Sequence, residues 1–309
     1  MDPALDIESL VIMLVAEEDG MHVAPARYKA AGPRKKGGML SWTYPPEIQP
    51  LALPPLTRVG TVGDGNCMLH SILFATSATY RSHDEDSRSI IADKFREVLI
   101  AREEELKDLA DAFFPEVGGA MALEESFEIL HGEREEINLE LGLLIARLYG
   151  YNFIAVQVQS DLTMRPVRMT MTNRDEALPT IAVNYLGGGV DFGRSGFSEG
   201  GHYEVIVSAE LGPVTPWAPP ASSSSSSSSE KTSGKKKKTR KAPKPIMVHG
   251  FNEGQTEYVF APDSPALMGL LVAFAVSSEG ASSQGGGARR RRHMRLTKRR
   301  KPIRRYPVV

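Results

Sequence analysis

Cysteine is almost absent from this sequence, with a single residue, Cys67, in 309 positions. One cysteine cannot form an intramolecular disulfide, and it cannot supply a cysteine-rich zinc site. Both exclusions fit a reducing compartment, so we expect an intracellular protein of the cytoplasm, the nucleus or both. A lone cysteine is either a nucleophile or a small buried hydrophobic residue, and the neighbouring residues must distinguish the two.

The sequence also lacks a long apolar run and a basic leader. Its most apolar stretch, residues 266–276, is eleven residues long, whereas a membrane-spanning helix needs about 20. The short apolar run at residues 10–16 follows acidic rather than basic residues, which is not the pattern of a secretory signal. We therefore do not expect a membrane to be a partner of this protein.

Charge is nearly balanced overall but is divided unevenly along the chain. Residues 1–229 contain 18 Lys+Arg against 33 Asp+Glu, a balance of −15, and residues 230–309 contain 19 against 5, a balance of +14. This division is typical of a folded acidic domain joined to a basic interaction arm. Residues 289–305 hold eleven basic and no aromatic residues, so any nucleic acid bound there would be held non-specifically through its phosphates rather than by base stacking.

Composition divides the chain into segments of different character. Dense proline favours an extended, loosely ordered arm at the N-terminus, and serine- and lysine-rich sequence cannot bury a core. The expected segments are a proline-rich arm at 1–57, a folded domain at 58–210, a disordered Pro/Ser/Lys-rich linker at 211–245, a short apolar island without an assigned role at 246–288, and an Arg/Lys-rich tail at 289–309.

The residues around Cys67 combine a turn with the start of a helix; positions 62–72 read VGDGNCMLHSI. The two glycines flanking Asp64 allow positive φ angles, so the backbone amides can converge on one point and hold an oxyanion. Apolar residues at helical spacing follow, with Asn66 as the expected N-cap. The N-terminus of a helix favours the thiolate of Cys67, the reactive form. A buried structural cysteine at a glycine-rich turn is an equally good interpretation of this stretch alone.

A nucleophilic cysteine needs a general base, and the sequence contains seven histidines. His70 lies three residues after Cys67 on the same helix, so the ring and the thiol diverge and the pairing is poor. His202 lies in the segment GGHYEVIV, where a glycine hinge leads into a strand. Glu204 shares one face of that strand with His202 and is the candidate group that orients the imidazole.

Hydrophobic periodicity predicts an α/β fold. Helical spacing covers three segments, residues 91–113, 120–130 and 137–148, the last followed by Gly150 as a C-cap. Strand patterns cover residues 152–158, 180–186 and 203–207, and the first is apolar on both faces, as in a central strand. The glycine-rich loop at 187–199 either closes on a substrate or is a plain surface connection.

The two motifs resemble those of the ovarian tumour (OTU) family of cysteine proteases, which cleave ubiquitin from other proteins. The resemblance rests on Gly-Asp-Gly-Asn-Cys at 63–67, Gly-His-Tyr-acid-Val-Ile at 201–206 and a middle block at 136–150, and it spans roughly Arg58 to Ser208. It implies a papain-like α+β fold, with a small mixed sheet packed between helices.

By position, the resemblance implies Cys67 as nucleophile, His202 as general base and Asp64 as the acid of the Asp-x-x-Cys turn. Glu204 stands where the family usually has Asn or Asp. The implied activity is that of a deubiquitinase acting on ubiquitin, polyubiquitin or a ubiquitin-like modifier through a Cys67 thioester, without a metal or cofactor. The alternative is a non-catalytic nucleic-acid-binding or structural protein, with an OTU-like binding module and a basic tail.

Overall fold

The structure is a computed structural model. It describes residues 6–18, 20–24, 28–29, 37–42, 44, 47–115, 118–132, 135–158, 164–167, 169–172, 174–186, 201–213, 215–217, 246–249, 251 and 253–283. The glycine-rich loop at 187–199, the serine run and the basic tail at 289–309 lie outside these residues, so the expectations about them stay predictions. Within the described ranges, none of the helices has the length and apolarity that a membrane span requires.

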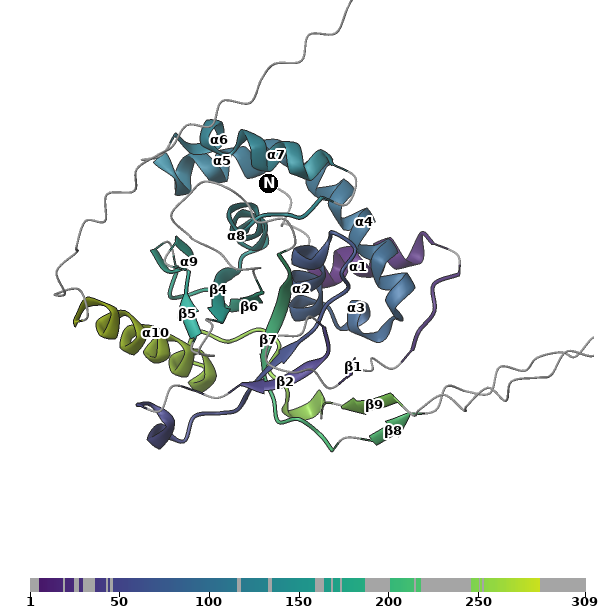
Figure 1. The fold of residues 1–309 in the computed structure, drawn as a ribbon. Coiled ribbons are helices and arrows are strands. Elements are labelled where there is room, and N and C mark those ends of the chain that lie inside the picture. Colours follow the sequence, from purple (N-terminus) through teal and green to yellow (C-terminus); the bar gives the residue numbers. More distant parts are fainter. Residues whose placement is uncertain are drawn as a thin grey trace, which may run out of the picture.

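A six-stranded mixed sheet organises the fold (Figure 1). In sheet order its strands are β2 (Met39–Trp42), β3 (Leu56–Val59), β7 (Tyr203–Ser208), β6 (Thr180–Tyr185), β4 (Asn152–Val158) and β5 (Met164–Pro166). Neighbouring strands pair antiparallel, except that β4 and β6 are parallel. Strands β4, β6 and β7 are the three that the sequence predicts, and they occupy the middle of the sheet.

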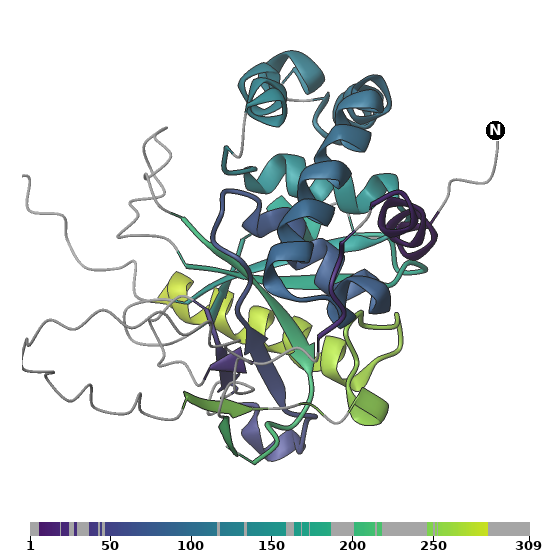
Figure 2. The same ribbon diagram turned by 90° about the vertical axis from the view of Figure 1, so that its right-hand side faces the viewer.

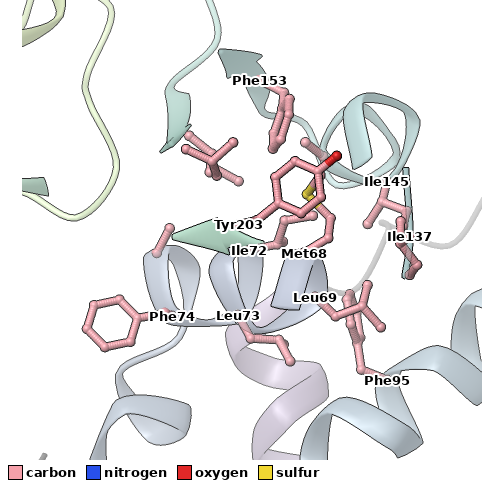
Figure 3. Packing of buried hydrophobic residues seen from close by; sticks show 14 of the residues in the cluster. Met68, Leu69, Ile72, Leu73, Phe74, Phe95, Ile137, Ile145, Phe153 and Tyr203 are labelled. Atoms are coloured by element: carbon pink, nitrogen blue, oxygen red, sulfur yellow. The ribbon is translucent and has the colours of Figure 1, made fainter. Parts of the chain in front are cut away.

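Helices cover one face of this sheet and enclose the larger hydrophobic core (Figures 1 and 2). They are α1 (Ile7–Ala16), α2 (Cys67–Thr76), α3 (Ala78–Ser82), α4 (Glu85–Ala101), α5 (Glu103–Phe113), α6 (Gly119–Ala122), α7 (Glu124–His131) and α8 (Leu139–Leu148). Helix α2 is central, because nine of its ten residues are buried. Figure 3 shows Met68, Leu69 and Ile72 of α2 packed among Phe95, Ile137 and Tyr203. The predicted α+β class, with a mixed sheet between helices, is confirmed.

The predicted continuous helix at 91–113 is wrong at Arg102, where the chain breaks into α4 and α5. Arg102 has φ −108° and ψ 19°, and it joins the two helices. Three glutamates, residues 103–105, fill the first turn of α5. Acidic residues there favour a new helix N-terminus, because they complement the partial positive charge of exposed backbone N–H groups. The predicted helix at 120–130 is likewise divided, at Leu123, into α6 and α7.

The opposite face of the sheet is covered by α10 (Pro265–Ser283), which Figure 1 shows beside β4 and β5. Its residues Ala266, Leu267, Leu270, Ala273 and Phe274 form a second core with apolar side chains of β4, β6 and β7. Phe260, just before α10, pairs with Thr180 of β6 through two backbone hydrogen bonds of 2.8 and 2.9 Å. The packed body therefore extends beyond residue 210, where the sequence placed the end of the domain.

The N-terminal segment also contributes to the body, contrary to the expected loose arm. Helix α1 packs against α4, α3 and α2, and its residues Ile7, Leu10, Val11 and Leu14 are buried. Asp6 caps α1 by accepting a 2.7 Å hydrogen bond from the Ser9 N–H.

A second, three-stranded sheet joins distant parts of the chain in the order β1 (Tyr28–Lys29), β9 (Ile246–His249) and β8 (Thr215–Trp217), all antiparallel. The remaining short elements are η1 (Gln49–Leu51), α9 (Met169–Thr172) and η3 (Glu253–Gln255).

Candidate active site

The structure brings Cys67 and His202 into one cleft of about 350 Å³. Cys67 is the first residue of α2, and His202 immediately precedes β7. The remaining lining residues are Gly37, Thr61, Gly63, Gly65, Glu136 and Gly201. Four of these six are glycines, so backbone and small side chains form much of the wall. An extended peptide can approach such a wall closely.

The start of β7 fixes the position of His202 relative to the thiol. The His202 carbonyl accepts a 2.8 Å hydrogen bond from the Leu186 N–H, which extends the β6–β7 ladder. The Thr61 hydroxyl donates a 2.6 Å hydrogen bond to the carbonyl of Tyr203. The backbone of Tyr203 also bonds to the Cys67 thiol. The thiol therefore lies against the residue that directly follows His202.

Burial raises the pKa of Cys67 to about 12, even though Cys67 begins a helix. Backbone hydrogen bonds from Tyr203 and Met68 favour the thiolate, whereas the negative charges of Glu136 and Asp64 oppose it. Cys67 is 3% exposed, and desolvation of the charged form outweighs the effect of the helix N-terminus on its pKa. Contrary to the sequence expectation, the resting group is a neutral thiol that must give up its proton to react.

The buried side chain of His70 contacts the turn before Cys67. His70 Nε2 lies 3.0 and 3.1 Å from the two carboxylate oxygens of Asp64, and His70 Nδ1 lies 2.5 Å from the Tyr80 hydroxyl. Asp64 also accepts a 3.0 Å hydrogen bond from the Asn66 N–H. Asp64 thus contacts His70 and its own turn, and its predicted part in catalysis stays a prediction.

We expect Asp64→Asn to remove a pH-dependent part of the stability. Burial raises the pKa of Asp64, but the hydrogen bond and attraction of His70 outweigh it and hold the pKa well below its usual range. A depressed pKa stabilises the fold above the unfolded-state value of about 3.9 and loses this effect as the pH falls below it. Urea unfolding should show Asp64→Asn about 1.5–3 kcal/mol less stable than the wild type at pH 7. This difference should shrink at pH 3, and an equal difference at both pH values would contradict the assignment.

The side chain of Asn66 does not cap α2, contrary to the expectation from sequence. Its amide nitrogen donates a 2.6 Å hydrogen bond to Asp93, and its amide oxygen accepts a 2.9 Å hydrogen bond from Arg96 Nε. Both partners lie on α4. The residue before the candidate nucleophile is therefore fixed to a neighbouring helix.

Arg96 links the Cys67 turn to the segment that leads to Glu136. Besides Asn66, its guanidinium donates to the carbonyls of Ile129 at 2.9 Å, Gly132 at 3.1 Å and Glu135 at 2.6 Å. Ile129 lies near the end of α7, and its carbonyl also accepts a hydrogen bond from the N–H of Gly132, the residue that caps the helix. Because the planar guanidinium presents five donors in a fixed geometry, one side chain can hold both walls of the cleft.

We expect Arg96→Lys to lower the free energy of unfolding by about 2 kcal/mol, because an ammonium keeps the charge but cannot reach all these acceptors. The rate at which iodoacetamide modifies Cys67 should change as well. Arg88→Lys is the matched control, since Arg88 is a second buried arginine of α4 that bonds to the carbonyls of Tyr80 and Arg81. The control should lose stability without altering the modification rate, and equal rate changes in both variants would argue against Arg96 as a tether of the cleft.

Glu204 forms a buried ion pair rather than a surface contact. Its Oε2 lies 2.8 Å from Arg58 Nε, with the two side chains 0% and 2% exposed. Its Oε1 accepts a 2.7 Å hydrogen bond from the Gly37 N–H, and Asn184 lies 3.4 Å from Oε2. These contacts join β3, β7 and β6. Glu204 therefore has a structural role in this ion pair. The orientation of His202 by Glu204 stays a prediction.

Sequence reasoning did not assign Arg58, Arg96 or Glu136 to the site. Arg58 carried a signal, because a charge within the buried strand Leu56–Val59 needs a partner. Arg96 and Glu136 carried none, since charged residues on a helix or before one are usually solvated. Their positions depend on how α4, α7 and the segment before α8 pack together.

No protein-family model matches this chain, and no curated protein matches it. Among solved structures it is similar to the OTU domain of OTUD1, with 15% sequence identity and a TM-score of 0.31, over 49% of this chain and 85% of that chain. A TM-score of this size decides nothing about function. The α+β class follows from the sheet and helices of the protein itself, and membership of the OTU family is a proposal.

Proposed function

We propose that this protein is an OTU-type cysteine hydrolase that cleaves isopeptide or peptide bonds at the C-terminus of ubiquitin or a ubiquitin-like protein. One observation carries the proposal: the only cysteine of the chain and the histidine of the GGHYEVIV segment line the same cleft, at the starts of α2 and β7. These are the two residues that the sequence motifs single out as nucleophile and base.

The chemistry follows from the state of the thiol. Because the pKa of Cys67 is raised to about 12, little thiolate exists at neutral pH, and attack must be coupled to proton transfer. His202 is the base that takes the proton as the sulfur attacks the carbonyl carbon. The turn at Gly63–Cys67 offers backbone N–H groups to the oxyanion. His202 then returns the proton to the leaving amine, and water hydrolyses the thioester.

Covalent capture tests this function directly. Full-length protein is incubated with ubiquitin that carries a C-terminal electrophile, and the adduct is mapped by mass spectrometry. We expect an adduct on Cys67 that is lost in Cys67→Ala and strongly slowed in His202→Ala. A folded wild-type protein that binds the probe without forming the adduct would favour the alternative, a non-catalytic OTU-like binding module. Cleavage of linkage-defined di-ubiquitins then identifies the preferred chain type.

The nucleic-acid partner expected for the tail is a separate matter. Residues 289–309 lie outside the described part of the chain, so their expected non-specific binding to nucleic acid rests on charge alone. It stays a prediction, as does the cytoplasmic or nuclear location.

A further inference from the structure

Glu136 places a carboxylate in the cleft that the proposed hydrolysis does not use. It lines the cleft with Cys67 and His202, and it is partly exposed. Its charge raises the pKa of Cys67, adding to the effect of burial. A negative charge beside a thiol hinders formation of the nucleophile, so this carboxylate is not explained by the activation of Cys67.

The position of Gly201 shows where the Glu136 carboxylate lies. A Cβ atom at Gly201 would be 2.4 Å from Glu136 Oε1 and 2.7 Å from the Tyr185 hydroxyl. Glu136 Oε1 and the Tyr185 hydroxyl oxygen are therefore at most about 5.1 Å apart. Both side chains reach the backbone directly before His202. The carboxylate thus lies at the histidine end of the cleft, close to where the bond that is cleaved must lie.

The backbone on both sides of Glu136 is anchored. Glu135 accepts the 2.6 Å hydrogen bond from Arg96, and Ile137 is fully buried. The backbone that carries Glu136 is therefore held in place on both sides. Two other charges that act on the Cys67 thiol are those of Asp64, which is paired with His70, and Arg96, which is bound to Asn66 and backbone carbonyls.

We propose that Glu136 is a specificity-determining residue that selects substrates with a cationic side chain next to the bond that is cleaved. A substrate cation beside this carboxylate gains a favourable charge interaction and also offsets its effect on the thiol. The inference rests on the proposed function for the identity of the reaction. The charge preference of the cleft can be measured independently of any hydrolysis.

The experiment uses two small reagents that differ in charge, the cationic 2-(trimethylammonio)ethyl and the anionic 2-sulfonatoethyl methanethiosulfonate. In each reaction the Cys67 sulfur attacks the sulfenyl sulfur and forms a mixed disulfide, methanesulfinate leaves with the electron pair of the broken S–S bond, and the thiol proton passes through His202 to solvent. Because the chain has one cysteine, every adduct reports on Cys67. The ratio of cationic to anionic rate constants, divided by the same ratio for 2-mercaptoethanol, measures the field in the cleft.

We expect full-length wild-type protein to prefer the cationic reagent, and Glu136→Gln to reduce the ratio about 100-fold. Removal of a unit charge about 6 Å away changes the rate of each reagent about ten-fold in opposite directions at an effective dielectric constant of about 40. Glu136→Asp should keep the preference, and Glu136→Lys should reverse it. Glu135→Gln is the matched control, because Glu135 is exposed and does not line the cleft. Its ratio should equal that of the wild type.

A ratio in folded Glu136→Gln equal to that of the wild type would overturn the inference, as would an equal fall in Glu135→Gln. If electrophilic ubiquitin fails to label Cys67 while the ratios behave as expected, the proposed function fails and the charge preference stands. If labelling succeeds, kinetics with peptide reporters that differ only in Arg, Gln or Glu next to the cleaved bond provide the second test. Glu136→Gln should raise KM for the Arg reporter and leave KM for the Gln reporter unchanged. A KM for the Arg reporter that does not rise would refute the selection of a substrate cation.

Discussion

Cys67→Ala should reduce hydrolysis of a ubiquitin C-terminal reporter at least about 10⁴-fold while leaving the fold intact. The variant removes the atom that forms the thioester, and the methyl group of alanine still fills most of the buried space at the start of α2. Single-turnover assays with the protein in excess over the reporter can measure the residual rate, and circular dichroism can confirm the fold.

His202→Ala should lower the rate by a similar factor, because a neutral thiol with a pKa of about 12 cannot react without a base. Residues that act as one unit are strongly non-additive, so the double variant should be little slower than either single variant. His83→Ala is the matched control, since His83 is also buried but contacts the Thr79 carbonyl and does not line the cleft. Substantial turnover by folded Cys67→Ala protein would contradict the assignment of Cys67 as the nucleophile.

Glu204→Gln should lower the free energy of unfolding by about 3–5 kcal/mol, because it leaves the buried Arg58 guanidinium without its counter-charge. Burial lowers the pKa of Arg58 and the negative charge of Glu204 raises it, so the pair compensates a desolvation cost. Denaturant unfolding at neutral pH measures the loss. Glu103→Gln is the control, since Glu103 pairs with Lys107 at the surface and should lose about 1 kcal/mol or less.

A double variant separates this structural role from the predicted orientation of His202. Arg58→Met combined with Glu204→Leu replaces the ion pair by apolar side chains and should recover most of the stability. If Glu204 also orients the imidazole, the double variant remains slow in kcat although it is stable. A stable double variant with wild-type kcat would limit Glu204 to the ion pair.

The parts of the fold that the sequence predicts are those with strong local patterns. Helix α2, the helix α8 and strands β4, β6 and β7 combine clear periodicity with glycine at their ends. Cys67 and His202 could be paired because each lies at the start of such an element. A local sequence pattern was sufficient to predict a site residue where the element that the pattern predicts also carries that side chain.

The parts that the sequence did not predict depend on contacts between distant segments. Helix α10 is apolar around most of its circumference and follows a low-complexity stretch, so no periodicity connected it to the sheet that it covers. Strand β3 contains Thr57 and Arg58, whose burial depends on β7 beside it. Arg96 acts through backbone carbonyls between residues 129 and 135, and the sequence around it gives no sign of these acceptors.

Because α10 packs on the sheet, residues 218–245 connect two parts of the folded body. Strands β8 and β9 flank this stretch and pair with each other, and α10 beyond it closes the second core. The stretch therefore connects two halves of one folding unit. We expect the two fragments left by a nick within it to complement each other through the sheet and α10, whereas a chain shortened to residue 210 should expose the apolar side chains of Ile154, Val156 and Ile206. The C-terminal fragment thus supplies one side of the second core, and we expect the protein to tolerate being split there and reassembled from its parts.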